Sequence, residues 1–241
     1  MVLEKNYLFF KTLRVALDDE KLASALLKRE HAYVTGISYT PDLAGEGVTV
    51  KTKKTPIIDT KVKTDEEFLA MANDTTRNEI RRTFKISELS FRLPDENRKG
   101  IYRLYGEFEK AGGRSARAFS YFRESIFAGA YYGGKLMAAI ICYDAKPYVR
   151  VYAIVSLRKT EGEIKKYSSF ATRRLVFELA KYARGRGYDW LDLGSVNLKD
   201  QTKAGIDAFK LSFGARLVHE YTYTYKSKLF RYASAVFNKR G

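Results

Sequence analysis

The chain has 241 residues, of which 45% are hydrophobic and 14% aromatic, so it can bury a core and is not a disordered tail. Its 44 Lys and Arg residues against 28 Asp and Glu residues give a net charge of +16, which favours polyanionic partners, although a solvated lysine-rich surface gives the same balance. Cys142 is the only cysteine, and the two histidines, His31 and His219, are far apart in the sequence. A disulfide framework within one chain is therefore excluded, and we expect no metal site.

The N-terminal segment 1–11 lacks the apolar stretch and small-residue cleavage site of a signal peptide. No apolar run approaches the roughly 20 residues that span a bilayer. We therefore expect a cytoplasmic protein.

Residues 1–50 are interpreted as an N-terminal extension, and residues 51–241 as the main domain. Within the extension, 18–29 predicts an amphipathic helix and 32–39 a strand, and the turn-forming segment 41–47 follows. Whether the extension completes the core or covers a substrate site stays open.

The first half of the main domain alternates short strands and helices. The segment 55–60 predicts a strand, and Thr64 with Glu67 forms a capping-box pattern at the start of a helix. The elements expected next along the chain are a helix at 76–82, a strand at 88–93, and helices at 95–111 and 114–124.

The second half is dominated by apolar strands. Gly133-Gly134 has the composition of a hairpin turn, because both positions tolerate positive φ. The expected order is strands at 127–132, 136–143 and 149–157, a helix at 168–186, a strand at 190–195, a helix at 205–213 and a strand at 217–225. This order predicts a mixed α/β fold with a central, largely antiparallel sheet flanked by helices.

Four segments, in this order and spacing, resemble Fem-type (FemAB-like) transferases of the GNAT superfold. They are Thr55-Pro-Ile-Ile-Asp59, Thr76-Arg-Asn-Glu-Ile-Arg-Arg82, Trp190-Leu-Asp-Leu-Gly194 and Gly205-Ile-Asp-Ala-Phe-Lys-Leu-Ser-Phe-Gly214. The fourth is the most specific, and the resemblance covers roughly residues 50–241. It implies a GNAT-like fold in which an acyl donor meets an amine acceptor where two central strands splay apart. Fem proteins carry two such halves, so the extension is interpreted as a remnant of the first.

The resemblance also implies a catalytic role for Lys210, where a cation stabilises developing negative charge or donor phosphate. The carbonyl of Phe209 would accept the incoming amine. Asp192, at the end of the 190–195 strand, is a candidate for orienting or deprotonating that amine, and a buried structural aspartate is the alternative. Cys142 lies in an apolar strand without a nearby histidine, so we expect direct attack with no covalent enzyme intermediate.

The donor is expected near the start of the 168–186 helix, because a helix N-terminus with free amides binds phosphate. From Arg150 to Arg186 the chain has ten basic and three acidic residues, which favours an anion there, although one solvated helix face gives the same count. The predicted donor-binding residues are Arg158, Lys159, Gly162, Ser168, Ser169 and Arg173.

The acceptor is expected beside the strand ends and the aromatic strands. The predicted acceptor-binding residues are Arg77, Arg81, Tyr131, Tyr152, Gly194 and Ser195. Arg77 and Arg81 are spaced to share a helix face with Arg82, as a phosphate clamp requires; a solvated helix surface and ordinary sheet tyrosines are the alternatives.

The leading hypothesis is an N-acyltransferase that uses acyl-CoA or an acyl carrier protein as co-substrate, with no permanently bound cofactor. A nucleotide-linked amino sugar of surface-polysaccharide synthesis is the expected acceptor. The alternatives are aminoacyl transfer from charged tRNA to a cell-wall precursor or protein, and a non-catalytic nucleic-acid-binding module. The basic and aromatic residues after 225 suggest contact with an anionic membrane, and packing of these aromatics on the domain is the alternative. The oligomeric state stays open.

Overall fold

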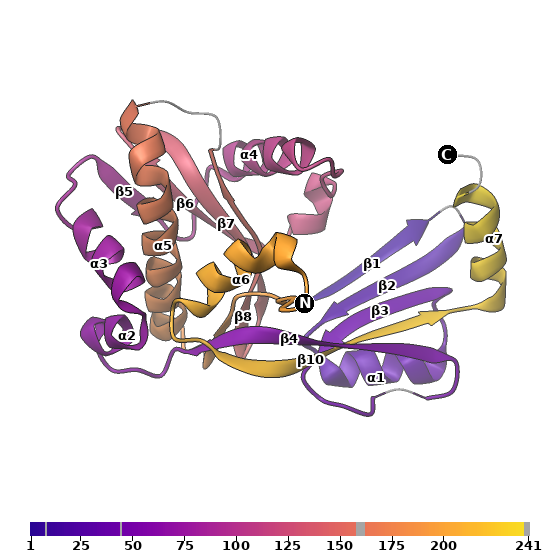
Figure 1. The fold of residues 1–241 in the computed structure, drawn as a ribbon. Coiled ribbons are helices and arrows are strands. Elements are labelled where there is room, and N and C mark those ends of the chain that lie inside the picture. The colour runs from indigo at the N-terminus through magenta and orange to yellow at the C-terminus, as the bar shows by residue number, and fades with distance from the viewer. Residues whose placement is uncertain (8, 44, 158–161, 239–241) are drawn as a thin grey trace. The chain divides into compact units, whose positions relative to one another are not determined.

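The computed structural model describes residues 1–7, 9–43, 45–157 and 162–238 (Figure 1). Its internal contacts divide the chain into two compact units. Unit 1 comprises Met1–Thr55, Ser195–Asn197 and Leu217–Gly241, and unit 2 comprises Pro56–Gly194 and Leu198–Arg216. Among the helices of the described ranges, none has the length and apolarity needed to cross a membrane.

Unit 1 is a sheet with one helix packed on it and another beyond its strand ends. Its strands follow the order β1-β2-β3-β10-β4. Their bounds are β1 Val2–Tyr7, β2 Phe10–Ala16, β3 Tyr33–Ser38, β4 Val48–Asp59 and β10 Arg216–Lys226. The helices are α1, Asp19–Lys28, and α7, Lys228–Asn238. The predicted helix at 18–29 and the strands at 32–39 and 217–225 are confirmed, whereas β1, β2 and α7 had no counterpart in the expectation.

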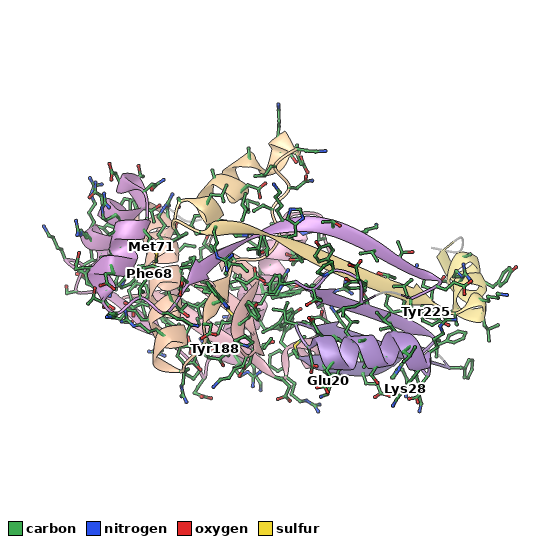
Figure 2. All side chains as sticks on the ribbon, turned by 90° about the horizontal axis from the view of Figure 1, so that it is seen from below. Glu20, Lys28, Phe68, Met71, Tyr188 and Tyr225 are labelled. Carbon is green, nitrogen blue, oxygen red and sulfur yellow. The ribbon has the colours of Figure 1, made fainter. Side chains whose placement is uncertain are left out.

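Helix α1 forms where its sequence supplies both caps and an apolar face. The Asp18 carboxylate accepts a hydrogen bond from the backbone N–H of Lys21 at 3.1 Å, and Arg29 ends the helix with φ of 54°. Leu22 is fully buried against β3, so close to Gly36 that a Cβ there would lie 2.3 Å from the leucine side chain. Figure 2 shows α1 running from Glu20 to Lys28, the latter at the same end of unit 1 as Tyr225.

Unit 2 is built on the strand order β4-β9-β8-β7-β6-β5. Its further strands are β5 Leu89–Arg92, β6 Ser125–Tyr132, β7 Lys135–Ala145, β8 Tyr148–Ser156 and β9 Trp190–Asp192. Neighbours pair antiparallel except β8 and β9, which are parallel. The predicted, largely antiparallel α/β architecture is confirmed. The turn between β6 and β7 has φ of 53° at Gly133 and 78° at Gly134, as the glycine pair predicts.

Helices cover both faces of this sheet. Their bounds are α2 Asp65–Met71, α3 Asp74–Thr83, α4 Arg98–Ala111, α5 Gly162–Gly185 and α6 Ala204–Leu211. One face packs Ala128, Ile140 and Val149 with α5 in the main core. Alternation along the strands directs their neighbours, among them Phe127 and Ile141, to the opposite face, where α4 packs. The capping box at Thr64 and Glu67 is present at the start of α2.

Several predicted boundaries are wrong. The strand expected at 55–60 begins at Val48, and the strand expected at 190–195 ends at Asp192. Two helix boundaries differ as well. Residues 114–118 are not helical, and only Phe119–Phe122 forms a short 3-10 helix, because this segment packs its aromatic side chains instead of closing helical hydrogen bonds. The backbone N–H of Arg117 donates to the Tyr105 hydroxyl at 3.2 Å, and Phe122 is completely buried. Helix α5 begins at Gly162, earlier than the predicted start near Ser168.

Candidate functional site

The parallel strands β8 and β9 pair over a short stretch and then separate. Their register joins Tyr148 to Trp190, Val149 to Leu191 and Arg150 to Asp192. Strand β9 ends there, whereas β8 continues to Ser156. Within the described residues no strand pairs with this edge of β8 beyond Arg150.

A buried ion pair lies where β8 and β9 stop pairing. Arg150 and Asp192 are cross-strand neighbours, and their guanidinium and carboxylate are in direct contact. The side chains are 6% and 0% exposed, so each charge depends on its partners inside the protein. The second carboxylate oxygen of Asp192 accepts the backbone N–H of Gly194 at 2.8 Å, which fixes the chain as it leaves β9.

Lys210 brings a cation to the same strand end from α6. Its Nζ donates to the carbonyl oxygen of Gly194 at 2.8 Å. Gly194 has φ of 77°, and a Cβ at this position would lie 3.1 Å from the carbonyl oxygen of Val151. Glycine therefore permits both the turn and the close approach of the two strands beside the ammonium group.

Aromatic side chains line the face of β8 that carries Arg150. Tyr152 follows two residues later and shares that face. Its ring lies 5.0 Å from Phe122, 5.3 Å from Tyr143, 5.8 Å from Tyr121 and 6.1 Å from Tyr105, between centroids.

Hydroxyl groups inside this aromatic cluster are close to one another. The hydroxyls of Tyr105 and Tyr152 are 3.4 Å apart, and the Tyr143 hydroxyl donates to that of Tyr121 at 3.0 Å. Burial, assisted by the contact with Tyr152, raises the pKa of Tyr105 to about 12. The Tyr105 hydroxyl therefore stays protonated near neutral pH.

The structure thus brings four predicted site residues into this region: Asp192, Gly194, Lys210 and Tyr152. Phe209 is also on α6, but its carbonyl accepts the Oγ–H of Ser212 at 2.7 Å and the backbone N–H of Ser212 at 3.3 Å. Both lone pairs of that carbonyl are thereby used, which counts against the amine-accepting role that the resemblance implies.

The predicted donor residues do not gather at a helix N-terminus, because α5 begins earlier than expected. Ser168 and Ser169 are inside the helix, so their amides are not those of its N-terminus; the Ser168 carbonyl accepts from Thr172 at 2.7 Å. Arg173 donates to Ser169 at 2.8 Å and lies 2.9 Å from a carboxylate oxygen of Glu79 on α3. Arg158 and Lys159 lie outside the described residues, and Gly162 is the first residue of α5.

The predicted phosphate clamp on α3 is occupied by carboxylates. Arg77 is paired with Asp74, and Arg81 lies 2.7 Å from Glu66 on α2. Each guanidinium therefore has its own counter-ion, and the two do not converge on one position.

The two remaining predicted acceptor residues have hydrogen bonds within their own units. The Tyr131 hydroxyl donates to Asp95 at 2.6 Å, and its side chain is buried near the start of α4. Burial, with that hydrogen bond, raises the pKa of Tyr131. Ser195, which belongs to unit 1, donates to Glu220 at 3.0 Å. Both arrangements are those of side chains that hold the fold.

Cys142 is completely buried on β7, and burial raises the pKa of its thiol. A neutral, inaccessible thiol is a poor nucleophile, which agrees with a mechanism without a covalent cysteine intermediate. Among the described residues, no group of three or more His, Cys, Asp or Glu side chains is placed to hold a metal ion.

Arg150, Tyr105, Tyr121 and Tyr143 contribute to the region but were not predicted. Arg150 had a usable signal, because it is a charged residue between Val149 and Val151 in an apolar strand, and such a position requires a buried partner. The three tyrosines, on α4, in the short 3-10 helix and on β7, had no comparable signal, since their convergence depends on tertiary packing.

No protein-family profile matches the sequence, and no curated protein matches it either. Solved structures, however, are similar over nearly the whole chain. The crystal structure of FemX gives a TM-score of 0.65 at 13% identity, covering 96% of this chain and 85% of that one. The C-terminal domain of a putative lysylphosphatidylglycerol synthetase from Agrobacterium fabrum gives 0.61 at 13% identity, with 93% and 81% covered. L-PGS from Bacillus licheniformis gives 0.54 at 12% identity, with 96% and 84% covered. At such identities the likeness concerns the fold, and the chain has the Fem-like GNAT fold that its sequence motifs indicated.

Proposed function

We propose that this protein is an acyltransferase that moves an acyl group from an activated carrier to an amino group, at the point where β8 and β9 separate. The observation that carries the proposal is the group of Arg150, Asp192, Gly194 and Lys210 at that point. A separated strand edge offers peptide groups to an extended donor, and the adjacent cation suits the charge that develops during acyl transfer.

In this mechanism Lys210 is the electrostatic catalyst. Attack of a neutral amine on a thioester or ester carbonyl produces a tetrahedral oxyanion, and collapse of that intermediate expels the thiolate or alkoxide of the carrier. The Lys210 ammonium is held at the strand end by the Gly194 carbonyl, at 2.8 Å, and stabilises that negative charge. The amine loses one proton overall, and the leaving group takes one up.

Asp192 acts as a positioning residue in this scheme. Its carboxylate is fully buried, contacts Arg150 and accepts the Gly194 N–H, so it holds the backbone on which Lys210 depends. This geometry favours the structural alternative for Asp192 over direct deprotonation of the amine, because one oxygen is bound to a guanidinium and the other to an amide.

Acyl-CoA or an acyl carrier protein is the proposed donor, and a nucleotide-linked amino sugar the proposed acceptor. The supporting observations are the net charge of +16 and the tyrosines around Tyr152, since both classes of substrate carry phosphate and the acceptor also carries an amino-sugar ring. Aminoacyl transfer from charged tRNA is the second candidate. It is favoured by the similarity of the fold to FemX and to the C-terminal domain of a putative lysylphosphatidylglycerol synthetase, an enzyme named for a lysyl-bearing product.

The first experiment measures thermal stability of the full chain with coenzyme A, acetyl-CoA, nucleotide-linked amino sugars and deacylated tRNA, at low and high salt. A ligand that prefers the folded protein raises its stability by mass action. A shift with coenzyme A or a nucleotide sugar that persists at high salt supports the leading candidate. A shift with tRNA alone, lost at high salt, supports the second.

The second experiment compares acyl transfer by Lys210→Ala with transfer by Lys135→Ala, using whichever donor binds. Loss of one oxyanion-stabilising group is expected to reduce kcat by about 100- to 1000-fold. Lys135 is an exposed lysine at the first position of β7 and is expected to be dispensable. Near-normal turnover of a folded Lys210→Ala protein would contradict the proposed catalytic role.

A further inference from the structure

Large apolar side chains are exposed where the β1–β2 hairpin of unit 1 meets α7. Phe9, in the turn between β1 and β2, is 99% exposed, and Leu229 and Tyr232 on α7 are 68% and 76% exposed. Solvent exposure of single apolar residues is ordinary, but three large ones gathered at one end of a unit indicate an interaction surface.

The hairpin and α7 are held together by packed rings. Phe230 lies 5.4 Å from Phe10 and 5.4 Å from Tyr33, measured between ring centroids. Phe10 directly follows Phe9 and is the first residue of β2, so α7 lies beside this end of the hairpin (Figure 1). This contact fixes the position of the exposed side chains within unit 1.

Helix α7 has one face against the rings of Phe10 and Tyr33, at the strand ends, and one face directed to solvent. Phe230 is half-buried, and its backbone N–H donates to the Ser227 Oγ at 3.2 Å, which caps the helix. Leu229 and Tyr232 are three residues apart and therefore lie one turn from each other on the exposed face. The packed ring orients the helix, and the orientation presents these two side chains outward.

Cations surround these apolar side chains. Lys228 and Arg231 on α7 are exposed, as are Lys226 at the end of β10 and Lys11 beside the hairpin tip. The sequence from Tyr221 to Gly241 contains five basic residues and no acidic one. Of the carboxylates on the adjoining elements, Glu4 on β1 lies 3.7 Å from His31, Glu30 is in the loop before β3, and Glu220 on β10 is buried.

We propose that this patch, formed by Phe9, Lys228, Leu229, Arg231 and Tyr232, docks on the surface of a bilayer that contains anionic lipid. Apolar side chains enter the headgroup region of a bilayer, while neighbouring cations lie at the level of the lipid phosphates. A bilayer with anionic lipid therefore accommodates both the apolar side chains and the cations of this patch. A nucleic acid would engage the cations but leave Leu229 in water. A second copy of the patch would bring like charges together. The proposal is independent of the transferase activity.

The test is co-sedimentation of the full chain with vesicles of phosphatidylcholine alone and of phosphatidylcholine with about one third phosphatidylglycerol. Binding is expected to the anionic vesicles and to be weak on the neutral ones. The variant Leu229→Ser/Tyr232→Ser and the variant Arg231→Glu are each expected to reduce the affinity for anionic vesicles about tenfold or more. Because Leu229, Arg231 and Tyr232 are exposed, their replacement is expected to leave the melting temperature close to that of the parent protein.

Two controls match these changes elsewhere in the chain. Leu198→Ser removes an apolar side chain that is 55% exposed in unit 2, and Lys85→Glu reverses an exposed charge after α3. Neither is expected to change vesicle binding. Failure of the parent protein to bind anionic vesicles, or equal binding by the α7 variants, would overturn the proposal.

Two further measurements distinguish membrane docking from nucleic-acid binding and from self-association. Competition of vesicle binding by tRNA, together with equal loss of tRNA and vesicle binding in Arg231→Glu but not in Leu229→Ser/Tyr232→Ser, would assign the surface to nucleic acid instead. Sedimentation velocity that shows a dimer dissociated by Leu229→Ser/Tyr232→Ser would assign it to self-association. Either result would overturn membrane docking.

Discussion

Two groups of charged residues in unit 2 have the composition of a substrate site, but their surroundings differ completely. Arg150 and Asp192 are cross-strand neighbours at the end of β9, with side chains that are 6% and 0% exposed. Arg81 of α3 and Glu66 of α2 form an ion pair with side chains that are 51% and 73% exposed. An ion pair affects the free energy of unfolding differently when it is exposed to water and when it is buried. The buried Arg150–Asp192 pair is therefore expected to govern both the stability of the protein and the geometry of the site.

The largest expected effect comes from removing one partner of the buried pair. Asp192→Asn removes the carboxylate charge that contacts the buried Arg150 guanidinium, which is expected to lower the free energy of unfolding by about 3–5 kcal/mol. Urea denaturation of the variant and the parent protein measures this loss. The matched change Asp74→Asn removes the partner of Arg77 on α3, where the Asp74 side chain is 85% exposed, and is expected to cost less than about 1 kcal/mol.

A double substitution keeps this comparison interpretable if the single variant does not fold. Arg150→Met with Asp192→Leu replaces both charges of this contact by apolar side chains. This protein is expected to be more stable than Asp192→Asn, because apolar replacements of a buried pair are often neutral. Equal stability of Asp192→Asn and Asp74→Asn would show that burial does not distinguish the two groups.

The features that the sequence predicts correctly are local ones. The capping box of Thr64 and Glu67 and the turn at Gly133-Gly134 depend on residues within a few positions of one another. The final strand is predicted because its alternation is strong. Such features need no knowledge of the rest of the chain, since hydrogen bonds and backbone preferences within a turn decide them.

The features that the sequence does not predict depend on distant partners. Arg150 and Asp192 are separated by forty-two positions, and only the register of β8 with β9 joins them. Residues 114–118 have a helical composition, yet the hydroxyl of Tyr105 takes the N–H of Arg117 and the following aromatic residues fill the core. Tertiary packing overrides local preference in both places.

A smaller effect is expected from the glycine that lets β8 and β9 approach. Gly194→Ala forces a side chain onto a residue with φ of 77° and places its Cβ 3.1 Å from the Val151 carbonyl oxygen. Gly134→Ala is the control, because it has φ of 78° and no heavy atom within 4 Å of the added Cβ. The control is expected to cost about 1–2 kcal/mol from its backbone conformation. Gly194→Ala is expected to cost about 1 kcal/mol more from overpacking.

Chemical denaturation of these two alanine variants under the same conditions gives the difference directly. The difference isolates the close approach of the strands, since both substitutions share the left-handed backbone. A Gly194→Ala protein as stable as Gly134→Ala would mean that the strand end relaxes without cost, and that the carbonyl which holds Lys210 is not rigidly placed.

The smallest expected effect belongs to the exposed pair on the helices. A double-mutant cycle with Arg81→Gln and Glu66→Gln is expected to give a coupling free energy of about 0.2–1 kcal/mol at low salt. At about 1 M salt the Debye length falls to about 3 Å, so this coupling is expected to shrink toward zero. Thermal or urea unfolding at both salt concentrations measures it. A coupling free energy above about 2 kcal/mol that persists at high salt would mean that Arg81, like Arg150, belongs to a strongly coupled pair. The Glu66 carboxylate at 2.7 Å would then be a fixed structural partner of Arg81, not one that an anionic substrate displaces.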